Sequence, residues 1–236
     1  MKKVLLFTLM ALGACFMSIK EASATHFYGG QLKWQQAGGN KIQFTFTSTW
    51  RRSFFGAPVV GQTLNGLGNL NTGYPGAFLP ISAVVTSVDV AKDQVYASWT
   101  GSYTYPATGN FTAQWDLCCR ISSLQDGNND QNTRFQTIVN VGPPYNNPPV
   151  SALPNIVFMS IGQSAASFSI PGSDPDGNSI SYRLSTNAES TLPVASPAGL
   201  TLSSNGVVTM NTTTRSSGQR FGIQAMIVDG LVGFPF

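Results

Sequence analysis

Apolar and polar residues alternate over short stretches along most of the chain. The clearest examples are Gln31–Trp34 and Lys41–Thr47, with the turn-forming segment Ala37–Asn40 between them. Alternation with a period of two is typical of a β-strand that buries one face, and two such runs around a Gly-containing turn predict a hairpin. Val84–Val90 and Gln94–Thr100 repeat this arrangement. Because no long helical period occurs, the pattern predicts an all-β fold.

The rest of the N-terminal half alternates predicted strands with predicted loops. The apolar side chains of Phe111–Cys119 occupy one face of a strand, and Arg134–Val141 forms the last strand. Residues 53–80 are rich in Gly, Asn and Pro, and we interpret them as a long irregular loop. Residues 125–131 form a second loop, rich in acidic and amide side chains. We therefore predict a β-rich N-terminal domain over residues 25–145.

A proline-rich segment, Gly142–Pro149, follows this domain. Prolines occupy half of its positions, so the segment is stiff and extended rather than flexible. We interpret it as a linker to a second domain over residues 146–236, with the two domains held end to end.

Short apolar runs separated by turn residues continue through the second domain. Six of them predict strands, namely Ile156–Met159, Ser167–Ile170, Ile180–Leu184, Leu200–Leu202, Val207–Met210 and Phe221–Val228. This pattern predicts a β-sandwich, so the chain as a whole is predicted to form two tandem β-sandwich domains. The second is expected to lack its last strand, because only an apolar stub follows Asp229. Either the sequence is a fragment with further repeats beyond Phe236, or a partner donates the strand by β-augmentation.

The first 24 residues have the pattern of a signal peptide. A basic start at Lys2–Lys3 precedes the apolar stretch Val4–Ile19, and Ala22–Ala24 is a small-x-small cleavage site. Leu12–Cys15 also resembles a bacterial lipobox, which would tether the protein to a membrane through a lipid on Cys15. Both alternatives predict an extracellular or cell-surface protein.

Charge and histidine content exclude several classes of function. The net charge of +3 includes three lysines of the signal peptide, so the exported part is close to neutral. Nothing suggests a nucleic acid or an anionic membrane as partner. His26 is the only histidine and lies at the start of the exported chain, which leaves no second histidine to activate a nucleophilic cysteine. We therefore predict a protein that is not an enzyme.

The two cysteines of the exported chain, Cys118 and Cys119, are adjacent. They are either two separate thiols on opposite faces of a strand, or a vicinal disulfide formed in an oxidising compartment, or a link to another chain.

An acidic turn, Asp174-Pro175-Asp176-Gly177, lies between two predicted strands of the second domain. The surrounding segment Ala166–Leu184 resembles the cadherin-like and "putative Ig" repeats of exported bacterial surface proteins, as do Pro197–Asn211 and Phe221–Gly230. In the first domain, His26–Gly30 and Phe111–Ile121 resemble a domain that often precedes such a repeat in secreted proteins.

The cadherin-like resemblance implies a calcium site at the junction of the two domains. Asp174 and Asp176 would be ligands, and Asn146 and Asn147 of the linker would add carbonyl oxygens, which suits the oxygen ligands that calcium takes. The linker carries Asn where the cadherin pattern has Asp, so binding would be weak. The alternative is a plain turn, since Asp-Pro-Asp-Gly is also good turn chemistry.

These observations predict an exported surface or matrix protein with an adhesive or structural role, whose partners are other surface proteins or glycans. The alternative function is a carbohydrate-binding module in which aromatic rings of the first domain stack on sugars. Trp34, Trp99 and Trp115 fit the buried face of predicted strands. Trp50 and Tyr103–Tyr105 fit the alternation less well, so we regard them as better candidates for the surface.

Overall fold

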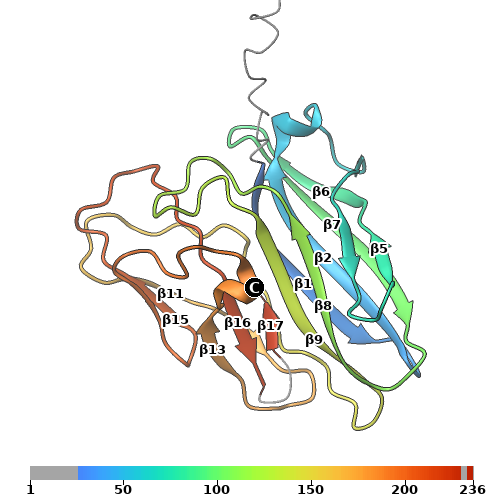
Figure 1. Ribbon diagram of the computed structural model, residues 1–236. Coiled ribbons are helices and arrows are strands. Elements are labelled where there is room, and N and C mark those ends of the chain that lie inside the picture. Colours follow the sequence, from blue (N-terminus) through green and yellow to red (C-terminus); the bar gives the residue numbers. More distant parts are fainter. Residues whose placement is uncertain (1–25, 230–232, 236) are drawn as a thin grey trace, which may run out of the picture.

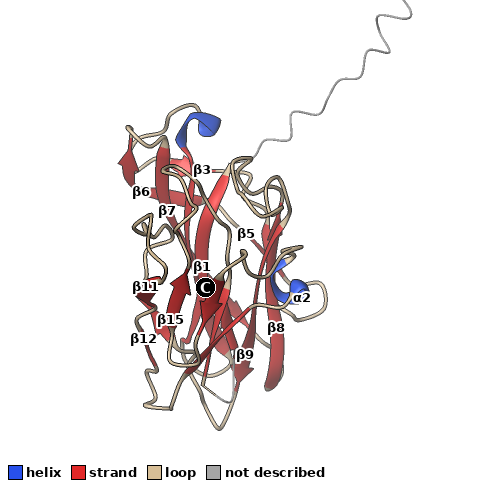
Figure 2. Cartoon of the chain, turned by 90° about the vertical axis from the view of Figure 1, so that its left-hand side faces the viewer, coloured by secondary structure: helices blue, strands red, loops and turns tan. Residues whose placement is uncertain are grey.

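The computed structural model describes residues 26–229 and 233–235 (Figure 1). The predicted signal peptide and the lipobox alternative at Cys15 lie outside the described residues. Strands dominate the described chain, with one short 3-10 helix and one four-residue α-helix (Figure 2). The prediction of an all-β fold is confirmed.

The first domain is a sandwich of two antiparallel sheets. One sheet has the order β1-β2-β7-β6-β3, and the other has the order β5-β4-β8-β9. The elements are β1 (Phe27–Gln36), β2 (Lys41–Arg51), η1 (Arg52–Phe55), β3 (Thr63–Leu64), β4 (Asn69–Asn71), β5 (Phe78–Pro80), β6 (Ala83–Asp89), β7 (Gln94–Thr104), β8 (Gly109–Leu117) and β9 (Thr133–Val141). The segment interpreted as one irregular loop, residues 53–80, thus contains three short strands.

Aromatic side chains fill the space between the two sheets of the first domain. Trp115 of β8 lies at the centre, with ring centroids 4.6 Å from Phe46 and 5.4 Å from Phe27. Its indole N–H donates to the carbonyl of Leu67 at 2.7 Å, which satisfies the one polar atom of this buried ring. The alternation of β2 continues through Trp50, so this side chain faces the core.

The expectation that Trp50 and Tyr105 lie on the surface is therefore wrong. Trp50 has no exposed area, and its indole N–H donates to Ser48 Oγ at 2.7 Å. Tyr105 is also buried, and its hydroxyl donates to the Thr72 carbonyl at 2.7 Å. Burial raises the pKa of the Tyr105 hydroxyl.

The second domain consists of three small sheets around a smaller core. The sheet orders are β10-β12, β11-β15-β14 and β13-β16-β17. The elements are β10 (Val150–Ser151), β11 (Ala166–Ser169), β12 (Gly172–Ser173), β13 (Ser181–Leu184), α2 (Asn187–Ser190), β14 (Leu200–Leu202), β15 (Val207–Met210), β16 (Ala225–Val228) and β17 (Gly233–Pro235). Leu200–Leu202 and Val207–Met210 are strands as predicted.

Three expectations for the second domain require correction. Ile156–Met159 is not a strand, and Phe221–Val228 is a strand only over β16. The expected lack of a last strand is also wrong, because the backbone of the apolar stub forms β17, which pairs antiparallel with β16.

The two domains lie side by side rather than end to end (Figure 1). β17 contacts both β9 and β1, and α2 contacts β9. One edge of the first sandwich is thus covered by the second domain along much of its length.

Candidate functional site

The junction between the domains contains a series of polar contacts between residues that are far apart in the sequence. Its first part is α2, a single helical turn. The Thr186 hydroxyl accepts from the backbone N–H of Glu189, and the Glu189 carboxylate accepts from the backbone N–H of Thr186, which forms a capping box. Arg183 donates to both Glu189 oxygens at 2.7 and 2.8 Å. This contact is the main cause that lowers the pKa of Glu189 to about 2.

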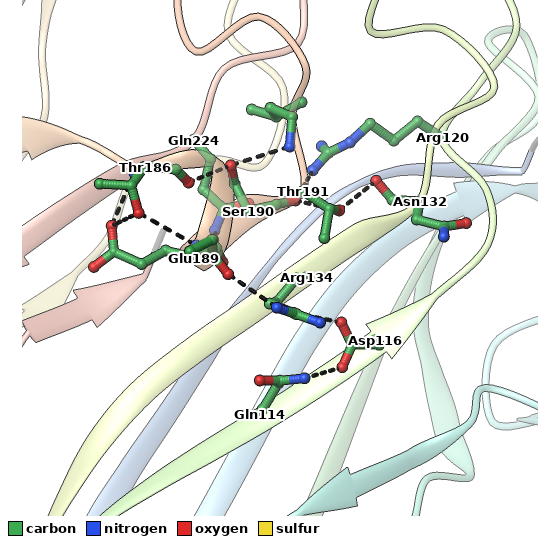
Figure 3. Close-up of polar contacts among 12 residues, drawn as sticks. Gln114, Asp116, Arg120, Asn132, Arg134, Thr186, Glu189, Ser190, Thr191 and Gln224 are labelled. Carbon is green, nitrogen blue, oxygen red and sulfur yellow. Dashed lines mark hydrogen bonds and ion pairs between the residues drawn. The ribbon is translucent and has the colours of Figure 1, made fainter.

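The C-terminal carbonyls of α2 are bound by side chains from other elements (Figure 3). Arg134 of β9 donates to the Ala188 carbonyl at 3.0 Å, and Arg120 donates to the Ser190 carbonyl at 3.2 Å. Gln224 donates to the Glu189 carbonyl at 3.3 Å. Carbonyls at a helix end have no partner within the helix, and cations are favourable there. The two arginines therefore fasten the second domain to the first.

The two arginines differ in their surroundings. Arg134 is partly exposed, and its Nε donates to Asp116 Oδ1 at 2.6 Å. Arg120 is only 5% exposed, and burial lowers the pKa of its guanidinium to about 10. Among the described residues, the Nε of Arg120 has no hydrogen-bond partner.

Asn128 forms the second part of the junction. It lies in the loop predicted over residues 125–131 and is completely buried. Its Nδ2 donates to the carbonyls of Val194 and Gly222 at 2.7 and 3.2 Å, and its Oδ1 accepts from the Val194 N–H at 3.1 Å. One side chain of the first domain thus binds two separate segments of the second.

The third part of the junction lies along β1. Gln31 Nε2 donates to the Leu153 carbonyl at 2.6 Å, and Lys33 Nζ donates to the Ser151 carbonyl at 2.9 Å. Burial lowers the pKa of Lys33. A Cβ at Gly29 would lie 3.0 Å from the Asn155 carbonyl oxygen, so the missing side chain permits this close approach.

The linker and the acidic turn lie in contact, as the sequence predicts, and hydrogen bonds join them. Asp176 accepts from the Asn147 backbone N–H at 2.5 Å and from its Nδ2 at 3.1 Å. Asn147 Oδ1 in turn accepts from the backbone N–H of Gln36 in β1 at 3.3 Å. Asn147 therefore connects the first domain, the linker and the acidic turn.

The neighbouring linker residue, Asn146, is bound from two sides. Its Nδ2 donates to Asp229 Oδ2 at 2.7 Å, and its Oδ1 accepts from Asn178 Nδ2 at 2.9 Å. Asp174 Oδ1 accepts from the backbone N–H groups of Asp176 and Asn178, whereas Asp174 Oδ2 has no hydrogen-bond partner in the part of the chain that the structure describes. Within the described residues, no group of three or more His, Cys, Asp or Glu side chains is arranged to hold a metal ion. Calcium binding here stays a prediction, and the hydrogen bonds close the turn without it.

The sulfur atoms of Cys118 and Cys119 lie against each other, and the peptide bond between these residues is cis; the vicinal disulfide stays a prediction. Cys119 is buried and Cys118 is exposed. The Cys119 carbonyl accepts from the backbone N–H groups of His26 and Phe27 at 3.3 and 3.2 Å, so the pair lies at the beginning of β1. His26 stacks on Phe54 with ring centroids 3.9 Å apart. The only histidine thus packs in an aromatic cluster.

A cleft of about 580 Å³ runs between the domains and into the second core. Its lining combines β1, the Ala91–Gln94 turn and two irregular segments, 153–161 and 215–225. The sequence did not point to it, because its walls come from segments that are far apart in the chain.

The functional residues that the sequence analysis missed are Arg120, Asn128 and Arg134. Each donates to a backbone carbonyl of the other domain. Since every residue carries a carbonyl, such contacts leave no motif. The signal in the sequence that could have pointed to Asn128 was the polar loop over residues 125–131, which interrupts the alternation of apolar and polar residues.

The fold and the junction define an all-β protein in which two small domains are fastened side by side. Residues 28–142 match the family model described as "Integrin beta-like protein A-E, N-terminal". This match supports a β-rich domain of the surface or adhesion type in the first half. It does not support the cadherin-like repeats of bacterial surface proteins that were expected in the second half.

Three Dictyostelium discoideum proteins are similar to the chain. Integrin beta-like protein A is 30% identical over 228 residues, which cover 87% of this chain and 11% of that protein. Integrin beta-like protein C is 30% identical over 217 residues, with 85% of this chain and 11% of the relative covered. Integrin beta-like protein B is 32% identical over 123 residues, which cover 50% of this chain and 6% of that protein.

The chain spans about a tenth of the length of proteins A and C. The first two alignments cover most of both domains. No solved structure matches the chain. Among the described residues, no helix is both long and apolar enough to span a membrane.

Proposed function

We propose that this chain is an exported cell-surface module with an adhesive or structural role and no enzymatic activity. The observation that carries the proposal is the match of residues 28–142 to the N-terminal region of integrin beta-like proteins. The first two relatives extend the similarity through the second domain.

The junction supports this role in physical terms. A module that holds a surface contact must keep its shape while its two ends are pulled or sheared. Polar contacts from Asn128, Arg120, Arg134 and Lys33 join the domains over several separate segments. We propose that the two domains act as one rigid unit, and that the partners are other surface proteins or glycans.

Two measurements test the location and the role. An epitope-tagged chain expressed in cells of its source organism is expected to be cleaved by trypsin added to intact cells. Beads coated with the purified chain are expected to adhere to such cells more strongly than beads coated with the heat-unfolded chain or with albumin. Equal adhesion of all three bead types, or protection of the tag from trypsin, would reject the proposal.

The carbohydrate alternative has lost two of its candidate residues, because Trp50 and Tyr105 are buried, whereas Tyr103 is partly buried against the first core. A glycan array with the same protein decides whether the partner is a sugar. Array signals that persist when methylated or acetylated sugars are added as competitors would show that glycans are among the partners. A hydrolase screen in which one carboxylate substitution abolishes turnover would overturn the non-enzymatic proposal.

A further inference from the structure

We propose that the cleft between the domains binds a single-chain amphiphile with a carboxylate head, such as a medium- or long-chain fatty acid. Its volume of about 580 Å³ lies within the ~300–1,000 Å³ range of small-molecule sites in proteins. This inference does not depend on the adhesive role and can fail without affecting it.

The inner wall of the cleft suits a hydrocarbon tail. It is lined by buried core residues of the second domain, including Ile170, Met210 and Ala225. A peptide entering this space would carry backbone N–H and C=O groups that need partners, whereas an alkyl chain needs none. Phe158, which is 76% exposed, also lines the cleft and marks its opening to solvent.

The polar lining suits a negatively charged head. Lys92, Arg120, Arg215 and Arg220 line the cleft. Among the described lining residues, the one carboxylate is Asp93, and it already accepts from Ser53 N and Oγ at 2.7 and 2.6 Å. Lys92 is itself paired with Asp89 at 2.6 Å, so the three arginines supply the excess of positive charge along the wall.

Two of these cations have an unused donor inside the protein. The Nε atoms of Arg120 and Arg215 are buried and have no hydrogen-bond partner within residues 26–229 and 233–235, while Arg120 as a whole is only 5% exposed. Buried donors are costly when they are left unpaired, so each such atom calls for an acceptor. One lining acceptor, Gln224 Oε1, is also unpartnered, so charged donors outnumber free acceptors.

Asp126 is the natural competitor of a ligand carboxylate. It attracts both Arg120 and Arg215, yet among the described residues it forms an ion pair with neither. Its Oδ2 is also buried and has no hydrogen-bond partner in the described chain. Removing this charge should leave the two guanidinium groups more available to an added carboxylate.

The test measures binding of laurate to the purified exported chain by titration calorimetry, below the critical micelle concentration. Dodecyltrimethylammonium, with the same tail and a cationic head, is the matched ligand control. We expect laurate to bind and the cationic amphiphile to bind at least about tenfold more weakly, since charge-assisted hydrogen bonds are lost. Each methylene added to the tail should tighten binding about fourfold until the cavity is full.

Variants assign the binding to the cleft. Arg120→Gln and Arg215→Gln should each weaken laurate binding about tenfold. Arg134→Gln is the matched control, because Arg134 binds α2 in the same way as Arg120 but does not line the cleft. It should change affinity less than twofold.

Asp126→Asn keeps the proposal testable if the arginine variants fail to fold. It should tighten laurate binding, a gain that misfolding cannot imitate. Absence of laurate binding, equal affinity for both head groups, or weaker binding in Asp126→Asn would overturn the proposal. An equal loss in Arg134→Gln and Arg120→Gln would do the same, because the effect would then reflect domain docking.

Discussion

The two domains reach their folded states by different means. The first has strands of up to 11 residues and a core built on stacked and tilted aromatic rings. The strands of the second are two to four residues long, and its core is smaller and opens into the cleft. Short strands in small separate sheets bury little surface, so they need support from elsewhere. The comparison teaches that the first domain is the scaffold on which the second is held.

The most severe test of this comparison removes the centre of the first core. Trp115→Ala is expected to cost about 3–5 kcal/mol, because it leaves a cavity and an unpaired Leu67 carbonyl. Since the second domain depends on the first, both should lose hydrogen-exchange protection together. Phe78→Ala, at a side chain that is 57% exposed, is the control and should have little effect. Persistent protection of residues 166–228 in Trp115→Ala would show that the second domain folds independently.

A smaller change should separate the domains without unfolding the first. Asn128→Ala removes three hydrogen bonds to Val194 and Gly222 and leaves their backbone groups unpaired, a loss of about 2–3 kcal/mol. Hydrogen exchange should rise in the second domain while β2 and β7 remain protected. Asn129→Ala is the matched control, because the Asn129 side chain donates to the adjacent Asp130 rather than to the second domain. If exchange rises equally in both domains, the scaffold view is wrong.

The linker offers a test that also bears on calcium. Asp176→Ala removes two hydrogen bonds to Asn147 and is expected to cost about 1 kcal/mol because the site is exposed. This loss should persist in EDTA, since the hydrogen bonds need no metal. The calcium hypothesis adds a rise in the wild-type melting temperature at millimolar calcium that the variant lacks. Asp130→Asn controls for the change in charge, because Asn tolerates the positive φ of 57° at this position. A wild-type melting temperature that does not change with calcium would reject the metal site.

The smallest expected effect is a pH dependence at α2. The pKa of Glu189 falls from 4.5 to about 2, chiefly through its hydrogen bond to Arg183. A lowered pKa in the folded state gives stability that is present above the unfolded-state pKa and is lost as the pH falls from about 4.5 to 2. The pair is partly exposed, so we expect only about 0.5–1 kcal/mol. Thermal melts at several pH values should show this loss in the wild type and not in Glu189→Gln, and identical profiles would contradict it.

The sequence predicted the parts of the fold in which local pattern and burial agree. Leu200–Leu202 and Val207–Met210 are strands as predicted, because turn residues bound each run and their buried faces meet one core. Ile156–Met159 has a similar apolar character, yet it lines the cleft instead of pairing with a strand. The burial of Trp50 was not predicted, because the polar residue Ser48, two positions earlier, interrupts the apolar residues on that face of the strand. Both side chains nevertheless face inward.

The candidate site was predictable only near the linker. Asn146, Asn147, Asp174 and Asp176 were expected to lie at one junction, and the structure joins Asn147 to Asp176 and Asn146 to Asn178 of the same turn. The chemistry of the contact could not be derived from residue types, since amides and carboxylates serve equally as metal ligands or as hydrogen-bond partners. The contacts of Asn128 and Arg120 depend on how two domains pack, which no local pattern encodes.

The hydrogen bonds of Asn147 have a mechanical consequence. Asn147 is bound to Gln36 on one side and to Asp176 on the other, while Lys33 binds Ser151 just beyond the linker. Tension applied along the chain is therefore shared between the covalent linker and several parallel bonds between the domains. We expect the module to resist stretching at low force and then to lengthen in one abrupt step when these bonds break together. Single-molecule pulling would record this step as a single force peak that precedes the unfolding of the first sandwich.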